Sequence, residues 1–303
     1  MHPRPYALLI LLSVTGIAFS GCHPGNAEAK QLRGACDGGD VAACNQFAVK
    51  LQKGEYVLRD DARAAELFEK ACTGGVGEAC ASLGVVYQRG RGVKADSARA
   101  LTLFEQGCER GAMDGCTRLG LQYQRGAGVT KDFTRAATLF HRACEGGDVS
   151  GCASLGTLYA AGDGVTQDFA RAADLFTRSC KADVALGCLG LGRLHAAGAG
   201  VARNDSAAAA LFDEACKGSE VEGCVARAAA YQAGVGVKQN LEEAADLYRE
   251  ACDDRHGEAC FRLAEMYDAG AGVYRQPQYA TQLRGRACEL GYSQACEKPK
   301  DGA

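Results

Sequence analysis

The chain has 303 residues, and its 34 Lys and Arg nearly balance its 37 Asp and Glu, for a formal charge of −3. The basic residues are scattered, which argues against the basic stripe that nucleic-acid binding requires, so no nucleic-acid partner is expected. Cysteine occurs 17 times. Such a content favours a compartment where disulfides persist and argues against the reducing cytosol.

The first 21 residues are predicted to be an export signal and not part of the fold. Arg4 precedes an apolar stretch of residues 6–19, which is too short to span a bilayer comfortably. The stretch runs into Ser20-Gly21-Cys22 and resembles a bacterial lipoprotein signal, with Cys22 as the lipid-bearing cysteine. The alternative is ordinary cleavage after Ser20, which would release a soluble protein. We favour lipidation because Cys22 is the one cysteine left over from the pairs described next.

The other cysteines recur with a period of 36 residues, and each is followed by a second cysteine eight residues later. A unit repeated at this period indicates a solenoid, in which each unit packs against its neighbours. Sequence alone does not fix the connectivity of disulfides, but eight identical local pairs make bonding within each pair the simplest scheme. The predicted pairs are Cys36–Cys44, Cys72–Cys80, Cys108–Cys116, Cys144–Cys152, Cys180–Cys188, Cys216–Cys224, Cys252–Cys260 and Cys288–Cys296.

Each unit begins with a predicted helix at its second cysteine. After Cys116, Leu119, Gly120 and Tyr123 follow at steps of three and four, the spacing of one buried helical face. Glycine costs roughly 1 kcal/mol inside an isolated helix, so its recurrence predicts close approach by a neighbouring helix. A Gly-x-Gly-Val segment then follows, as at residues 126–129, and predicts the turn that closes the helix.

A second helix is predicted after this turn, because residues that cap helix N-termini recur there. They are Asp60, Asp96, Asp132, Asp168, Asn204 and Asn240, with Gln276 followed by Pro277 in the last unit. Helices this short are not stable alone, so the pairs must stack. The prediction is an all-α fold, an α/α superhelical solenoid of about seven disulfide-stapled helix pairs. Its predicted parts are the signal (1–21), a tail with a partial capping helix (22–34), the repeat solenoid (35–297) and a C-terminal tail (298–303).

No catalytic residue, metal or cofactor is predicted. A Cys-x7-Cys spacing does not suit zinc, which usually takes closer pairs of ligands. Ser-x-x-Lys, Gly-x-Ser-x-Gly and His-Glu-x-x-His are all missing from the sequence. His195 occupies the place of the unit's tyrosine, and we interpret it as a core residue.

The pattern L-G-x-x-Y-x-x-G-x-G-V-x-x-D, found at residues 119–132 and 155–168, resembles the Sel-one-like repeat, a relative of the tetratricopeptide repeat. With its paired cysteines and export signal, the chain is most similar to the Helicobacter cysteine-rich protein family. The resemblance implies a right-handed superhelix and a protein-interaction scaffold. For some members of that family it also implies penicillin binding with weak β-lactamase activity.

Related solenoids present one side of the first helix on a concave surface, and here its residues vary from unit to unit. Such variation fits a ligand face or unconstrained exposure to solvent. We expect Leu121, Leu189 and Phe261 to be exposed there, which favours a groove for a peptide or protein. The predicted ligand face comprises Val85, Gln88, Thr117, Leu121, Gln124, Thr157, Leu189, Arg193, Gln232, Phe261 and Glu265, and Val225 and Ala229 lie in the same row.

Taken together, the sequence predicts an exported, monomeric scaffold that binds a protein or peptide along its concave face. It is expected in the bacterial cell envelope, held by lipid on Cys22, with secretion as a soluble protein as the alternative. Contact with a membrane is expected only through that anchor. The alternative function is a penicillin-binding protein with weak β-lactamase activity.

Overall fold

The computed structural model describes residues 24–296, and all regular structure in that range is α-helical. The predicted signal, Cys22 and the tail 298–303 lie outside the described residues. The helices are α1 (Pro24–Asp37), α2 (Val41–Lys53), α3 (Asp61–Thr73), α4 (Gly77–Arg89), α5 (Ser97–Glu109), α6 (Met113–Arg125), α7 (Phe133–Glu145), α8 (Val149–Ala161), α9 (Phe169–Cys180), α10 (Ala185–Ala197), α11 (Asp205–Lys217), α12 (Val221–Ala233), α13 (Leu241–Asp253), α14 (Gly257–Ala269), α15 (Pro277–Glu289) and α16 (Ser293–Cys296).

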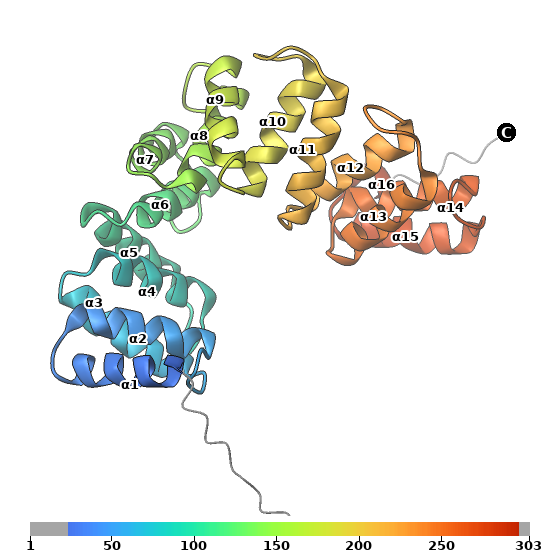
Figure 1. Cartoon of the computed structure of the whole chain (residues 1–303). Helices are drawn as coiled ribbons and strands as arrows, with labels where there is room; N and C mark the ends of the chain where they lie inside the picture. The colour runs from blue at the N-terminus through green and yellow to red at the C-terminus, as the bar shows by residue number, and fades with distance from the viewer. Residues whose placement is uncertain (1–23, 297–303) are drawn as a thin grey trace, which may run out of the picture.

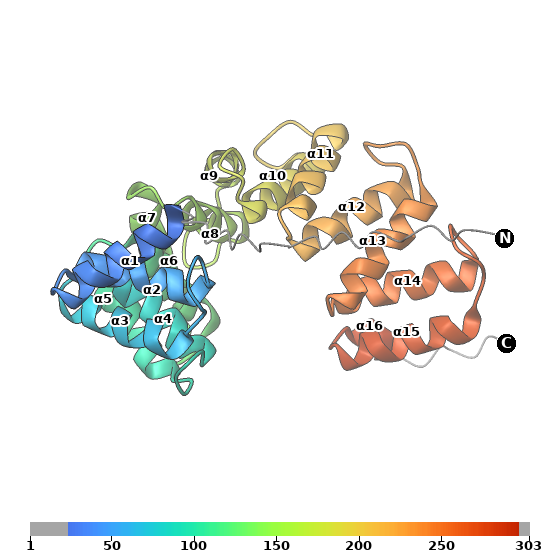
Figure 2. The same ribbon diagram turned by 60° about the horizontal axis from the view of Figure 1, so that its bottom comes forward.

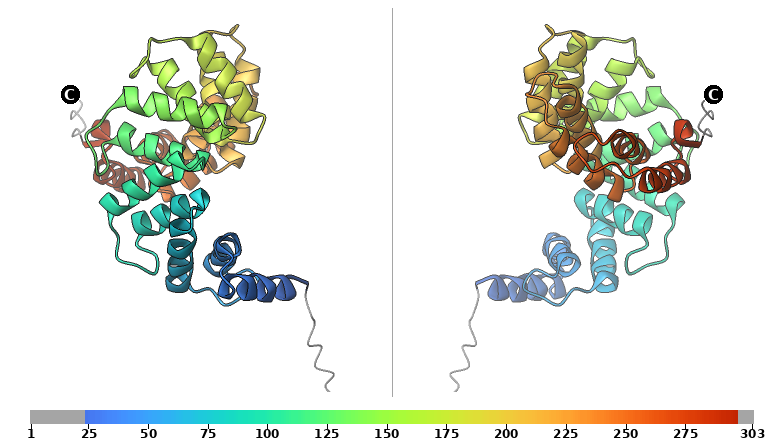
Figure 3. Two further views of the ribbon diagram at one scale, coloured as in Figure 1. Left: turned by 90° about the vertical axis from the view of Figure 1, so that its left-hand side faces the viewer. Right: turned by 90° about the vertical axis from the view of Figure 1, so that its right-hand side faces the viewer.

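The helices form seven antiparallel pairs, from α2–α3 to α14–α15, stacked into a curved rod with α1 at one end and α16 at the other (Figure 1). The pairs also rotate along the rod, so some helices are seen end-on and others side-on in the turned views (Figures 2 and 3). The predicted all-helical solenoid of about seven pairs is confirmed. At its N-terminal end, α1 is a full helix of 14 residues and not the expected fragment.

The ends of the helices form where the sequence predicts them, because local hydrogen bonds satisfy the free backbone groups. The side chain of Asp132 accepts a hydrogen bond from the backbone N–H of Arg135, 2.9 Å away, and caps the start of α7. Gly126 closes α6 in the left-handed region at φ 71° and donates its N–H to the Gln122 carbonyl at 2.8 Å. The start and end of these helices are therefore determined by residues within the same unit.

The two helices of a unit pack closely through the recurrent glycine. Gly120 in α6 faces Phe140 in α7, and a Cβ atom added to Gly120 would lie 2.6 Å from Cε1 of that ring. Phe140 is fully buried. The glycine thus has the role expected from the sequence: it makes room for the aromatic side chain of the partner helix.

The even-numbered helices form the inner layer of the curved rod. Successive members of this series, from α4 to α12, contact one another in addition to their odd-numbered partners. In a curved stack, the layer whose helices come closest lies on the inner side. Within residues 24–296, no helix is long and apolar enough to cross a membrane.

Candidate functional site

Eight disulfides join the units, each linking the end of an odd-numbered helix to the even-numbered helix that follows it. They are the eight pairs expected from the sequence, and they include all the cysteines of the described residues. Cα–Cα distances range from 4.4 Å in Cys216–Cys224 to 4.8 Å in Cys288–Cys296. A cation of the next odd-numbered helix often holds the same joint, as where Arg142 donates to the Cys108 carbonyl at 2.9 Å. The inner layer is therefore held in place joint by joint.

The predicted ligand face follows this inner layer, but its members differ in exposure. Gln88 and Arg193 are exposed, and most of the others are half-buried: Val85, Leu121, Gln124, Thr157, Gln232, Phe261 and Glu265. Thr117 and Leu189 are buried, at 6% and 1% exposure, so their expected exposure was wrong. Both directly follow a second cysteine, and in α6 and α10 that position is covered by the neighbouring unit, whereas Val225 and Phe261 at the same position are half-buried.

The contacts of these residues show why the row does not form the expected groove of exposed apolar side chains. The Thr117 hydroxyl lies 2.5 Å from the Asp148 carboxylate at the start of the next inner helix. Leu189 belongs to a core cluster with Phe212. Phe261 packs on the ring of Tyr292, with 5.3 Å between centroids. Leu121 also packs against a core cluster. The large apolar residues of the row thus stabilise the stack.

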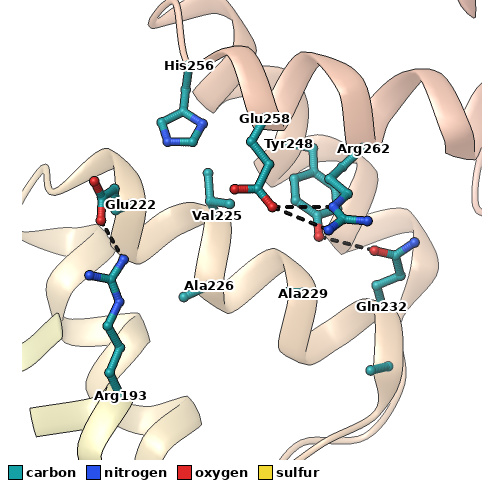
Figure 4. A pocket seen from close by; sticks show the side chains of 11 residues that line it. Arg193, Glu222, Val225, Ala226, Ala229, Gln232, Tyr248, His256, Glu258 and Arg262 are labelled. Carbon is teal, nitrogen blue, oxygen red and sulfur yellow. Dashed lines mark hydrogen bonds and ion pairs between the residues drawn. The ribbon is translucent and has the colours of Figure 1, made fainter. Parts of the chain in front are cut away.

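A pocket of about 510 Å³ opens in this row between α12 and α14. From the predicted row it takes Arg193, Val225, Ala229 and Gln232, with Ala226 beside them (Figure 4). The small side chains of α12 form an apolar floor. The polar residues lie around it, so the pocket combines an apolar surface with several hydrogen-bonding groups, as ligand sites commonly do.

Charged pairs line two sides of the pocket. Arg193 of α10 forms an ion pair with Glu222 of α12. Arg262 of α14 lies between Glu258, 3.4 Å away, and Glu265, 3.3 Å away. The side chains of these pairs are two-fifths to three-fifths exposed. Such exposed pairs contribute little to stability, so a ligand can exchange partners with them at small cost.

Tyr248 of α13 lines the pocket beside Arg262 (Figure 4) and is buried. Its hydroxyl donates to Oε1 of Gln232 at 3.1 Å. Burial raises the pKa of Tyr248 to about 12, so the phenol remains a hydrogen-bond donor well into the alkaline range. The pair fixes the Gln232 amide at one end of the pocket.

His256 stands at the opposite end and caps α14. Its Nδ1 accepts from the backbone N–H of Ala259 at 3.3 Å. A ring that accepts at Nδ1 carries its proton on Nε2 when neutral. Figure 4 shows the ring next to Val225 at the edge of the pocket. The pocket thus has an imidazole donor at one end and an amide at the other.

Tyr248, His256, Glu258, Arg262 and Glu222 line the pocket, and the sequence did not point to them as site residues. Two signals were present. Tyr248 takes the place of the phenylalanine of earlier units, which adds a hydroxyl to an otherwise apolar stripe. In α14 the residue before the second cysteine is Ala259. The first two inner helices also have alanine there, whereas α6, α8, α10 and α12 have glycine.

That difference accompanies the opening of the pocket. At Gly223, the glycine of α12, an added Cβ would lie 2.6 Å from the Cβ of Ala215. Glycine therefore allows an inner helix to pack closely against the odd-numbered helix of the preceding unit. Ala259 is fully buried with its extra methyl group, and α14 is not packed against α12 as earlier inner helices are packed on one another.

His195 is half-buried and not a core residue, because its Nδ1 lies 3.2 Å from the Ala202 carbonyl in the turn after α10. The tyrosines at the same position in most units are half-buried too. Among residues 24–296, no group of three or more His, Cys, Asp or Glu side chains is arranged to hold a metal ion.

Comparison with known proteins places this geometry among helical repeats. The family model of the Sel1 repeat matches residues 41–76, 77–111, 114–148, 149–184, 185–219, 221–256 and 257–292. No curated protein matches the chain.

Among solved structures, a protective antigen of uropathogenic Escherichia coli with an SLR fold is 27% identical at a TM-score of 0.65. That match covers 88% of this chain and 57% of the antigen, so this chain spans little more than half of that protein. A Sel1 repeat protein from Oxalobacter formigenes is 18% identical, with a TM-score of 0.70 and coverage of 86% and 98%. Cysteine-rich protein B of Helicobacter pylori is 28% identical, with a TM-score of 0.36 over 42% of this chain and 96% of its own.

Proposed function

The chain belongs to the Sel1 repeat family, and on that premise we propose that it is an exported scaffold that binds a protein or peptide along its inner row of helices. Sel1 repeat proteins generally mediate interactions between proteins. A solenoid with a disulfide at every joint suits this role, because it presents the row in one shape and loses little conformational entropy on binding.

The observation that carries the proposal is the pocket between α12 and α14. Its volume of about 510 Å³ is enough for one or two side chains of a peptide, and it lies in the row whose residues vary from unit to unit. The floor at Val225 and Ala229 offers apolar contact. The ends at His256 and Gln232 offer a donor and an amide that can pair with a peptide backbone.

Filling the pocket tests this function. We would select peptides from a random library on the oxidised protein, then measure their affinity by fluorescence anisotropy. Ala229→Trp places an indole over the floor and should weaken binding by at least about tenfold, the effect of losing one central anchor. Ala170→Trp, at an exposed alanine of α9 away from the pocket, is the matched control and should leave affinity unchanged. Equal affinity for both variants would refute binding at this pocket.

Export and lipid attachment complete the proposal. The eight disulfides support an oxidising compartment. The signal 1–21 and Cys22 lie outside the described residues, so their role is proposed from the sequence, as are the boundaries 22–34, 35–297 and 298–303 and the monomeric state. Intact-mass spectrometry of the mature protein should find acyl chains on Cys22. A mature protein that lacks them would instead favour secretion as a soluble protein.

The penicillin-binding alternative rests on the family resemblance, and no arrangement within residues 24–296 favours it. Hydrolysis of a chromogenic cephalosporin by the oxidised protein would reopen it.

A further inference from the structure

The guanidinium of Arg110, at the end of α5, lies directly against the disulfide between Cys72 and Cys80. Nη1 donates to Sγ of Cys80 at 3.0 Å and lies 3.7 Å from Sγ of Cys72. The same nitrogen donates to the Cys72 carbonyl at 2.5 Å, which holds the cation in place. A positive charge in this position stabilises a thiolate on either sulfur, and most strongly on Cys80.

Arg110 is a departure from the repeat. The residues at the same place in other units, at multiples of 36 along the chain, carry no positive charge: Gly74, Gly146, Ala182, Gly218, Asp254 and Leu290. Arg178 also approaches a disulfide, but its Nη1 is 3.6 Å from Sγ of Cys144 and its Nη2 donates to the Cys144 carbonyl. The guanidinium at the joint between α3 and α4 thus lies closer to a disulfide sulfur than the guanidinium of Arg178 does.

Cys72 is also the sulfur-bearing residue of a surface pocket. This pocket has a volume of about 430 Å³ and is lined by Cys72, Gln106, Arg110 and neighbours, while Cys80 is not part of its lining. Cys80 is fully buried, whereas Cys72 is 5% exposed. Arg99, on the same pocket, is paired with Glu69 at 2.6 Å. A molecule that enters the pocket therefore meets Cys72 first, beside two guanidinium groups.

We propose that Cys72–Cys80 is a site of thiol–disulfide exchange with small anionic thiols. The thiolate attacks Sγ of Cys72 and forms a mixed disulfide. The bond between Cys72 and Cys80 breaks, and its electron pair leaves with Cys80 as a thiolate that Arg110 stabilises. Exchange is faster when the leaving thiol has a low pKa. A second thiolate then attacks the mixed disulfide, so that two small thiols are oxidised to one disulfide and the protein pair is reduced.

Glutathione, which carries two carboxylates, is the probe. The full-length oxidised protein is treated with graded glutathione, quenched with acid, alkylated and mapped by mass spectrometry. Four other bridges have both cysteines buried and serve as the comparison: Cys36–Cys44, Cys108–Cys116, Cys144–Cys152 and Cys252–Cys260. Cys72–Cys80 should react faster than these four, and the glutathione should be on Cys72. The terminal bridge Cys288–Cys296 is more exposed, and its rate of reaction with glutathione serves as the internal reference for each sample.

Three variants test whether the guanidinium of Arg110 accelerates exchange at Cys72–Cys80. Arg110→Gly restores the glycine of other units and should slow exchange at Cys72–Cys80 by roughly threefold to tenfold, the range expected for about one pKa unit on the leaving thiol, with Cys288–Cys296 unchanged. Arg110→Lys should retain most of the rate. Asp254→Arg should accelerate exchange at Cys216–Cys224, the pair in the equivalent joint. Circular dichroism establishes that each variant is folded.

Several results would overturn the proposal. An unchanged rate in Arg110→Gly would show that the cation has no effect on the bridge. Glutathione on Cys80 would mean that the direction of attack is wrong. Faster exchange at any of the four buried bridges, or no acceleration in Asp254→Arg, would equally count against it. The outcomes at Cys72–Cys80 do not bear on peptide binding between α12 and α14, because that bridge joins α3 to α4.

Discussion

Replacing Gly120 by alanine tests the close packing of α6 against α7. The added Cβ would lie 2.6 Å from Cε1 and 3.1 Å from Cζ of Phe140. That ring is fully buried in a cluster with Leu155 and Leu158, so it cannot move without displacing neighbours. Overpacking of this kind costs about 1–3 kcal/mol, while alanine gains roughly 1 kcal/mol in helix propensity. The expected result is a net loss of up to about 2 kcal/mol.

Gly285 in α15 provides the matched control. An added Cβ there meets no atom within 4 Å, so Gly285→Ala should stabilise the protein by roughly 1 kcal/mol through propensity alone. Thermal unfolding followed by circular dichroism at 222 nm compares the two oxidised variants, and roughly 2–4 °C corresponds to 1 kcal/mol. The difference between them isolates the steric cost. If Gly120→Ala raised the midpoint as much as Gly285→Ala, the packing account would be refuted.

Three further predictions concern the pocket tyrosine, a disulfide and a helix cap. Burial raises the pKa of Tyr248 to about 12, so the unfolded chain loses this proton first and the wild type should lose up to about 2–3 kcal/mol between about pH 10 and 12. In urea unfolding, Tyr248→Phe should not show this loss of stability at alkaline pH. If the variant lost as much stability as the wild type between about pH 10 and 12, Tyr248 would not be its source. Replacing both Cys144 and Cys152 by alanine should lower the unfolding free energy by about 2.5 kcal/mol, and an unchanged thermal midpoint would count against the staple. Asp132→Ala should cost about 1 kcal/mol through its lost cap, unlike Gln276→Ala, whose side chain makes no cap bond.

Much of the fold could be predicted because its determinants are local. Asp132 caps its helix through an amide three residues away, and Gly126 closes the preceding helix through a carbonyl four residues away. Each disulfide spans eight residues. Interactions of such short range repeat with the sequence, so a period of 36 residues already specifies a stack of helix pairs.

The candidate site was predicted only in part. Arg193 and Gln232 were expected in the row and do line the pocket. Leu189 was expected in the same row but is buried, because its exposure depends on how closely the neighbouring unit sits. The sequence did not point to Tyr248 or His256 as site residues. Their place in the pocket depends on where α13 and α14 lie relative to α12.

The sequence by itself determined the unit, its helix boundaries and its capping residues, since each depends on atoms within a few turns of one another. It favoured the cysteine pairing through the constant spacing of eight residues, and the structure has that pairing. Only the tertiary structure decided which inner positions face solvent and where a pocket opens. The pocket gathers side chains from α10, α12, α13 and α14, and its size follows from the spacing between units. Small differences such as alanine for glycine at one packed position accompany that spacing, which appears only when the helices are stacked.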